Sequence, residues 1–157
     1  MSNALASAKQ PLATYVGMQR LVEETIGVKL FTLMEIDRER NVARRSYTNS
    51  PDAYPVSGEK PLEHNRWTEH VEVGQNLFVA NSISEIADVF PDYELIQSLG
   101  CESCLNIPIV IGGQVEGTLN CLHVAGHYTH EKVVAAESLK LAGALTFLMA
   151  RRYKRVG

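Results

Sequence analysis

Two of the three cysteines, Cys101 and Cys104, are separated by two residues, a spacing found in zinc sites and in thiol redox centres. A structural zinc ion needs four ligands, and the chain has no second pair at this spacing. A redox pair of the thioredoxin type begins a helix after a strand, whereas Cys104 begins a predicted strand. We therefore interpret both residues as buried structural cysteines.

Three histidines, His123, His127 and His130, lie close together in the sequence. They span a strand end and a loop instead of one helix face, and no nearby acidic cluster completes a coordination shell. We interpret them as solvated loop histidines. The chain also lacks a glycine-rich phosphate loop, a Ser-His-Asp order and paired carboxylates. The sequence thus predicts no catalytic residue, no metal and no cofactor.

The polar residues that stand out are Asn106 and Asn120, each within a strongly apolar predicted strand. Side chains alternate along a strand, so Cys104, Asn106 and Pro108 share the face opposite an all-apolar set. On the return strand, Thr118 and Asn120 share one face. A buried amide is costly without partners. Both amides either hydrogen-bond a polar ligand in a pocket, or they pair with each other or with loop backbone.

Pocket walls are expected from aromatic residues in the segments that cover this face, where they either stack on a ligand ring or belong to the core. The predicted ligand-binding residues are Tyr47, Tyr54, Trp67, Tyr93, Cys104, Asn106, Thr118 and Asn120. Further candidates are Arg45, Asp88, Phe90 and Asp92.

The elements that must position these side chains follow from periodicity and turn residues. Residues 1–26 predict a helix with a frayed start at 1–11, ended by Gly27. Strands are predicted at 30–36, 42–48, 77–80, 105–111 and 114–124, with Gly112 and Gly113 as a tight turn between the last two. Short helical segments are predicted at 67–73, 83–89 and 92–99. Residues 49–66 contain three prolines and are predicted to be irregular.

A long C-terminal helix is predicted at 129–153, capped by Thr129. Its main apolar stripe is formed by Val134, Leu141, Leu145 and Leu148, with Ala142 and Met149 beside it. Strands that adjoin along the chain pair as hairpins, which predicts an antiparallel sheet in an α+β fold. The terminal helices would cover one sheet face, and the loop with the short helices would cover a pocket on the other.

Length and composition fit one domain over residues 1–157 of a globular protein, with 45% apolar residues and a net charge of -3. The one basic run, Arg151, Arg152, Lys154 and Arg155, is interpreted as a solvated helix end, so no nucleic-acid partner is expected. No apolar run approaches the ~20 residues that span a bilayer, and no secretory signal is present. With an odd number of cysteines, these features predict a cytoplasmic protein without a membrane partner.

Residues 100–145 resemble the C-terminal half of a GAF domain. The features that carry the resemblance are Ile107-Pro108-Ile109, the turn Gly112-Gly113, Gly117 three residues into the return strand, and Tyr128 before the closing helix. The segments LFTLMEID and LFVANSISE fit the N-terminal half, so the resemblance covers residues 12–147. It implies a six-stranded antiparallel sheet, with helices on one side and a ligand pocket on the other. Only five strands are evident, so the sixth is expected within 49–66.

The resemblance implies a sensory, non-catalytic module that binds an unidentified small molecule and forms a homodimer through its terminal helices. The alternative is an enzyme, because one branch of the family resembles free methionine-(R)-sulfoxide reductase. Aligned on Ile107-Pro108, Gln97 stands where that branch has its nucleophilic cysteine, and Cys104 and Asn120 stand where acids are expected. Such an enzyme would have to use Cys101 or Cys104 instead. Covalent chromophore attachment and cyclic-nucleotide binding have no motif of their own in this chain.

Overall fold

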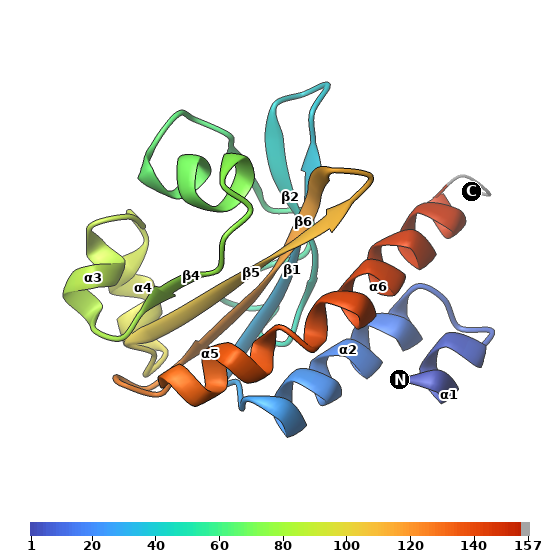
Figure 1. The fold of residues 1–157 in the computed structure, drawn as a ribbon, viewed down its shortest axis with the longest axis horizontal. Coiled ribbons are helices and arrows are strands. Elements are labelled where there is room, and N and C mark those ends of the chain that lie inside the picture. The colour runs from blue at the N-terminus through green and yellow to red at the C-terminus, as the bar shows by residue number, and fades with distance from the viewer. Residues whose placement is uncertain (155–157) are drawn as a thin grey trace.

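The computed structural model describes residues 1–154, and its central element is a six-stranded antiparallel sheet (Figure 1). The strands are β1 (Leu30–Asp37), β2 (Val42–Thr48), β3 (Glu59–Pro61), β4 (Phe78–Ala80), β5 (Ser103–Ile111) and β6 (Gln114–His123). Their order across the sheet is β3-β2-β1-β6-β5-β4. The predicted α+β class and the six-stranded sheet are confirmed, and β3 lies in the segment expected to contain the sixth strand.

Turn chemistry explains the central hairpin. Gly112 and Gly113 connect β5 to β6 with φ angles of 62° and 82°, a left-handed pair that glycine adopts without strain. Further along β6, Gly117 passes so close to β1 and α6 that a Cβ there would overlap the carbonyl oxygen of Met34 and the ring of Phe147. The sheet therefore packs tightly at this point only because residue 117 lacks a side chain.

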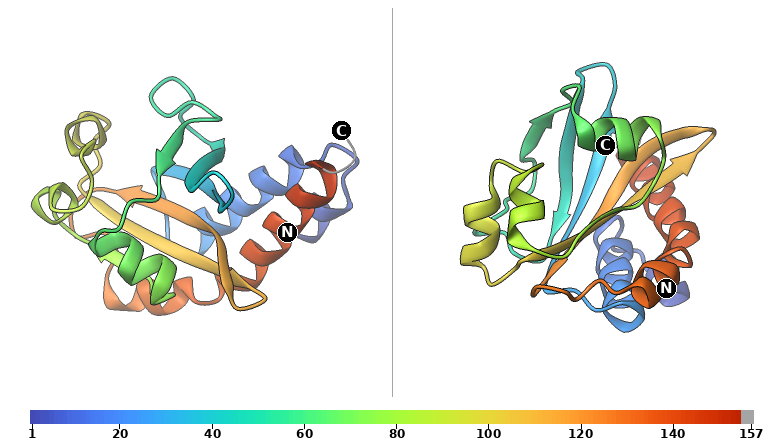
Figure 2. Two further views of the ribbon diagram at one scale, coloured as in Figure 1. Left: turned by 90° about the horizontal axis from the view of Figure 1, so that it is seen from above. Right: turned by 60° about the vertical axis from the view of Figure 1, so that its left-hand side comes forward.

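Helices α1 (Ser2–Ala6), α2 (Leu12–Thr25), α5 (His130–Ala136) and α6 (Leu139–Lys154) cover one face of the sheet (Figures 1 and 2). The apolar stripe predicted for the first helix is confirmed: Tyr15, Met18, Val22 and Ile26 are all buried. They pack in one cluster with Leu105, Ile107 and Ile109, the apolar face of β5. The N-terminal segment differs from expectation, because it contains the separate short helix α1. Arg155, in the predicted basic run, lies outside the described residues.

The prediction of a single C-terminal helix at 129–153 is wrong, because α5 and α6 are separate helices with a bend of 44° between them. At the break, the Ser138 hydroxyl donates to the Ala135 carbonyl oxygen at 2.7 Å, a local bond that competes with the helical backbone pattern. Thr129 occupies the N-cap position, but its side chain makes no capping hydrogen bond. Among residues 1–154 no single helix is long and apolar enough to cross a bilayer, and α5 with α6 passes that test only as this bent pair.

The main apolar stripe predicted for the C-terminal helix does not face the sheet. Val134, Leu141, Leu145 and Leu148 are exposed, with 57%, 74%, 39% and 46% of their surface accessible. The residues of α6 that face the sheet are instead Leu139, Phe147 and Ala150, together with Gly143, where a side chain would collide with Ile109. Gly143 and Ala150 let α6 approach the sheet closely, whereas Leu141, Leu145 and Leu148 point away from it.

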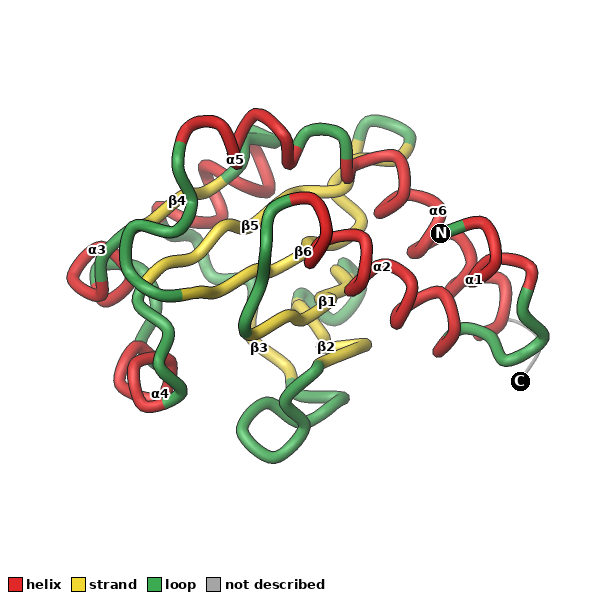
Figure 3. The backbone as a smooth tube through the Cα atoms, turned by 90° about the horizontal axis from the view of Figure 1, so that it is seen from below, coloured by secondary structure: helices red, strands yellow, loops and turns green. Residues whose placement is uncertain are grey.

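The opposite face of the sheet is covered by segment 49–66, the π-helical turn η1 (Thr68–Val73) and helices α3 (Ile83–Ala87) and α4 (Tyr93–Ser98) (Figure 3). A second apolar cluster forms here, with Val71, Ile86 and Ile96 buried against Leu30 and Leu122 of the sheet. Ser82 and Glu85 form a capping box at the start of α3. These segments form the second layer, on the side of the sheet opposite the terminal helices.

Candidate functional site

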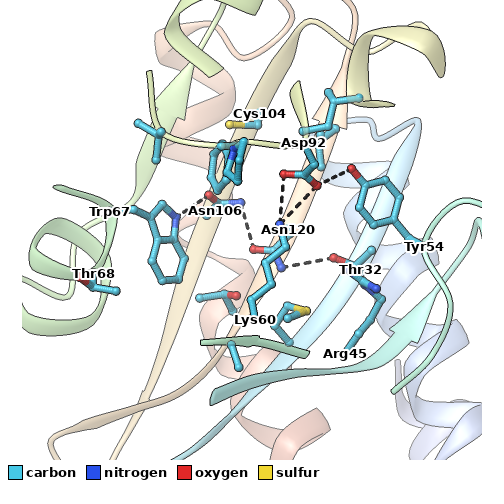
Figure 4. A pocket seen from close by; sticks show the side chains of 18 of the residues that line it. Thr32, Arg45, Tyr54, Lys60, Trp67, Thr68, Asp92, Cys104, Asn106 and Asn120 are labelled. Carbon is cyan, nitrogen blue, oxygen red and sulfur yellow. Dashed lines mark hydrogen bonds and ion pairs between the residues drawn. The ribbon is translucent and has the colours of Figure 1, made fainter. Parts of the chain in front are cut away.

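A cavity of about 390 Å³ lies between the middle of the sheet and the covering segments. Strands β1, β2, β5 and β6 form its floor, and segment 60–68 and residues 89–96 form its walls (Figure 4). This volume falls within the range of small-molecule sites. Most of the wall is apolar, contributed by Leu30, Met34, Leu62, Val89, Phe90, Ile96 and Leu122.

Six of the eight predicted residues line this cavity: Tyr54, Trp67, Cys104, Asn106, Thr118 and Asn120. Three of the further candidates, Arg45, Phe90 and Asp92, also line it, whereas Asp88 does not. Cys104 and Asn106 face the cavity because Leu105 and Ile107, which alternate with them, are packed under the helices. The expected assignment of the two sheet faces is therefore correct.

The expectation that Tyr47 lies on the cavity wall is wrong. Its ring packs against Tyr15 and Phe31 on the helix side, and its hydroxyl donates to Gln19 of α2 at 2.6 Å. The cause is an irregularity in the pairing of β1 with β2: Leu33 pairs with Tyr47 but Met34 pairs with Arg45, so one extra residue lies in β2. This bulge reverses the alternation, so Arg45 faces the cavity and Tyr47 faces the core.

Tyr93 also lies outside the cavity. It is the first residue of α4 and packs at the edge of the second apolar cluster, with its hydroxyl 3.5 Å from Glu94. The neighbouring residue Asp92 lines the cavity instead, because it precedes the helix.

A chain of hydrogen bonds crosses the cavity floor (Figure 4). The indole Nε1 of Trp67 donates to Asn106 Oδ1 at 2.9 Å, and Asn106 Nδ2 donates to Asn120 Oδ1 at 2.9 Å. Asn120 Nδ2 donates in turn to Thr32 Oγ1 at 3.2 Å. Thus the two amides pair with each other, one of the alternatives that the sequence left open, while the cavity remains beside them.

Charged residues gather at one wall of the cavity. The Tyr54 hydroxyl donates to Asp92 Oδ2 at 2.7 Å, and Lys60 Nζ lies 3.2 Å from Asp92 Oδ1. Burial alone would raise the pKa of Asp92, but the Lys60 charge and the hydrogen bonds from Tyr54 and Lys60 outweigh it and hold the pKa below its ordinary value. The Arg45 guanidinium lies over the Tyr54 ring, 4.9 Å from its centroid. Burial lowers the pKa of Arg45.

Sequence reasoning missed several residues of the lining, among them two that hydrogen-bond to predicted ones, Thr32 and Lys60. Thr32 accepts from Asn120 and lines the cavity, and the signal for it was a hydroxyl residue within an otherwise apolar strand. Lys60 pairs with Asp92 from the three-residue strand β3. Nothing in the sequence around Lys60 marked it, because so short a strand has no readable periodicity.

The three cysteines are free thiols and are all buried. Burial raises the pKa of Cys104 to about 12, and it also raises the pKa of Cys101, where Lys29 opposes the shift only in part. A protonated thiol is a poor nucleophile. Cys104 thus contributes a small apolar surface to the cavity.

The three histidines were expected to be solvated, but two of them make specific contacts. His123 and His127 stack with ring centroids 3.6 Å apart, and His127 Nε2 lies 2.8 Å from the Ile26 carbonyl oxygen. His130 is exposed at the start of α5. Within residues 1–154 no three His, Cys, Asp or Glu side chains lie close enough together to hold a metal ion.

The sequence profile of the GAF domain matches residues 16–150. No curated protein matches the chain. Among solved structures, the GAF domain of a two-component sensor histidine kinase from Bacillus halodurans is 14% identical and covers 94% of this chain and 99% of its own, with a TM-score of 0.75. The GAF domain of a phosphoenolpyruvate-protein phosphotransferase from Coxiella burnetii is 18% identical and covers 98% and 91%, with a TM-score of 0.73.

A domain of a two-component sensor histidine kinase from Sinorhizobium meliloti 1021 is also similar, at 12% identity, 96% and 100% coverage and a TM-score of 0.70. At these identities the structural likeness establishes the fold, and the profile match over most of the chain establishes the family. The chain belongs to the GAF domain family, whose members are generally small-molecule-binding sensory domains.

Proposed function

We propose that this protein is a non-catalytic sensory module that binds a small molecule in the cavity over β1, β5 and β6. The observation that carries the proposal is the chain of hydrogen bonds through Trp67, Asn106, Asn120 and Thr32 on the floor of a mainly apolar cavity. An apolar cavity with a few converging polar groups is the usual form of a small-molecule site.

Three features favour binding over catalysis. The cavity contains one cysteine, Cys104, and burial keeps its thiol protonated at neutral pH. No histidine is among the residues that line the cavity, so a base next to a nucleophile is missing from this set. The carboxylate of Asp92 is already engaged by Tyr54 and Lys60. A methionine sulfoxide reductase that uses Cys101 or Cys104 would therefore start from inactive thiols.

The sensory role is supported by the similar domains. Those from Bacillus halodurans and Sinorhizobium meliloti belong to two-component sensor histidine kinases. By analogy, this chain would change its contacts with a partner when the cavity is filled.

Homodimer formation is part of the proposal. Leu141, Leu145 and Leu148 lie exposed along α6, and Leu12 is exposed at the start of the neighbouring α2. Apolar residues grouped in this way on a helix layer indicate an interaction surface. A second copy of the chain placed across a two-fold axis would cover these residues on both subunits at once.

Native mass spectrometry of the purified protein tests the binding function. We expect an adduct of small mass that is released when the protein is denatured. The adduct should be absent from Thr118→Phe, in which a ring occupies the cavity, and present in Val73→Asp, a change at a residue that is 78% exposed on η1. A wild-type protein with no adduct, and with no thermal stabilisation by any compound of a small-molecule library, would contradict the proposal.

A further inference from the structure

The guanidinium of Arg45 is the least satisfied polar group in the cavity wall. The residue is only 6% exposed, and Nη1 donates to the Pro55 carbonyl oxygen at 3.0 Å. Its Nε atom is buried without an acceptor, and Nη2 makes no hydrogen bond within the described part of the chain. Arg45 also forms no ion pair among residues 1–154. A buried cation is costly unless it is paired.

The other charges around the cavity do not neutralise Arg45. The charge of Asp92 acts on Arg45, but Lys60 and the Tyr54 hydroxyl already bind the oxygens of this carboxylate. Glu63 also belongs to the wall, but it is exposed, so water screens its charge. Lys60 is itself exposed, with 45% of its side chain accessible, so water screens its charge as well. Arg45 is thus the buried cation of the cavity, and neither Asp92 nor Glu63 forms an ion pair with it.

The uncharged groups of the floor also offer donors. Because the indole of Trp67 can only donate, the chain of hydrogen bonds runs from Trp67 towards Thr32. Asn120 uses one of its two Nδ2 hydrogens on Thr32, and the Thr32 hydroxyl, which accepts that bond, keeps its own hydrogen. Donors for an acid oxygen thus remain beside the cavity in addition to Arg45.

We infer that the ligand carries an acidic group, a carboxylate or a phosphate, that binds to the guanidinium of Arg45. The inference rests on the proposed function, since it assigns the chemistry of the ligand in the same cavity. A guanidinium presents parallel N–H groups at the spacing of two acid oxygens. The rings of Trp67 and Phe90 and the aliphatic wall residues leave an apolar space for the rest of the molecule.

A purely structural role for Arg45 makes a different prediction. The contacts with Pro55 and with the Tyr54 ring could serve only to hold segment 51–58 on the sheet. In that case the cavity would have no preference for acids over neutral molecules of the same shape. The preference itself is therefore the measurement that separates the two roles.

The test uses the full-length ¹⁵N-labelled protein and three probes at constant ionic strength: benzoate, phenyl phosphate and the neutral benzamide. The Nε–H signal of Arg45 and the Nε1–H signal of Trp67 report on binding. We expect one of the acids to bind at least about tenfold more tightly than benzamide and to shift the Arg45 signal, because hydrogen bonds to charged groups contribute about 1.5–3 kcal/mol. Tighter binding of benzoate indicates a carboxylate ligand, and tighter binding of phenyl phosphate indicates a phosphate.

Variants of adjacent arginines provide the control. Arg45→Gln should remove the preference for acids, and Arg45→Lys, which keeps the charge but loses the two-pronged edge, should retain only part of it. Arg44→Gln makes the same change in net charge on the same strand, but Arg44 is exposed and does not line the cavity. It should leave the preference intact.

Three results would overturn the inference: benzamide binding as tightly as both acids, a preference that survives in Arg45→Gln, or no saturable binding of any of the three probes. In the first case the cavity still binds small molecules, so the proposed function stands while the acid assignment fails. If no probe binds and native mass spectrometry also finds no adduct, both fail together.

Discussion

The indole Nε1 of Trp67 lies 2.9 Å from Oδ1 of Asn106, and this contact sets the direction of every hydrogen bond that follows it on the cavity floor. An indole N–H has no acceptor capacity, so the amide of Asn106 must turn its oxygen towards Trp67. Its nitrogen then faces Asn120, whose amide must turn in the same sense. The residue that precedes η1 thereby fixes the orientation of side chains on three central strands.

Replacement of Asn120 by leucine should reduce the free energy of unfolding by about 1–3 kcal/mol, because Asn106 Nδ2 then loses its acceptor in a buried position. Urea unfolding measures the change. The double variant Asn106→Leu/Asn120→Leu should lose less than the sum of the single variants, since both break the same bond. Asn3→Leu, on the exposed face of α1, serves as the control. An unchanged stability of Asn120→Leu would mean that the two amides do not pair in solution.

The thiols should be unreactive in the folded protein. Burial raises the pKa of Cys104 to about 12, and Cys101 and Cys121 are fully buried. Less than one equivalent of thiol should react with Ellman's reagent at neutral pH, and all three should react after denaturation. In a thiol-dependent assay with free methionine sulfoxide we expect no turnover. Activity of the wild type that disappears in Cys101→Ser or Cys104→Ser would establish the enzymatic alternative instead.

The exposed leucines of α6 give a test of assembly. Leu148→Asp and Leu145→Asp should each convert a dimer to a monomer in sedimentation velocity at micromolar concentration, because a carboxylate would be buried in the interface. Both residues are exposed in the single chain, at 46% and 39%, so neither change should unfold it. Val73→Asp adds the same charge at an exposed valine of η1 and should remain dimeric. A wild type that sediments as a monomer removes the dimer from the proposal.

Stability should fall as the pH decreases through the range in which histidine titrates. Burial, followed by the neighbouring His127, Lys132 and Lys29, lowers the pKa of His123. Its Nδ1 accepts the Val124 N–H at 2.9 Å, a bond that protonation of Nδ1 breaks. The pKa of His123 in the folded protein lies below the unfolded value of about 6.5. The contribution of neutral His123 to the free energy of unfolding is therefore fully present above about pH 6.5, and it is lost as the pH falls through the folded pKa.

Thermal melts between pH 8 and pH 5 measure this effect. His123→Asn, whose Oδ1 can replace Nδ1 as the acceptor without titrating, should show a weaker dependence on pH than the wild type. His64→Asn is the control, because the His64 side chain is 85% exposed. An equal pH dependence in wild type and His123→Asn would show that His123 does not contribute.

Sequence patterns predicted the cavity floor because alternation is regular wherever strands pair without interruption. Asn106 and Asn120 are directly opposite each other in the part of β5 and β6, from Ser103 to Ile109, that pairs without a register shift. The same rule failed for Tyr47, since the bulge in β2 depends on how β1 and β2 pair, and a single strand does not reveal this.

Apolar periodicity failed in another way for the last helix. The spacing of Leu141, Leu145 and Leu148 shows that they share a face of α6, but it does not say whether the sheet or solvent meets that face. The face that packs on the sheet is the one that carries Gly143, the small residue at which the helix approaches Ile109. Packing distance, which depends on two elements at once, is not encoded in the periodicity of one.

Asn120 lies on the cavity floor. Because side chains alternate along β6, the residues on either side of it, Leu119 and Cys121, are buried in the helix-side core. One strand is thus both the floor of the cavity and the surface on which α2 and α6 rest. A ligand that displaces β6 by a fraction of an ångström would press on the helices directly, without any loop or hinge in between. Ligand binding on one face of the sheet would thus be transmitted through β6 to the exposed leucines of α6 on the other face.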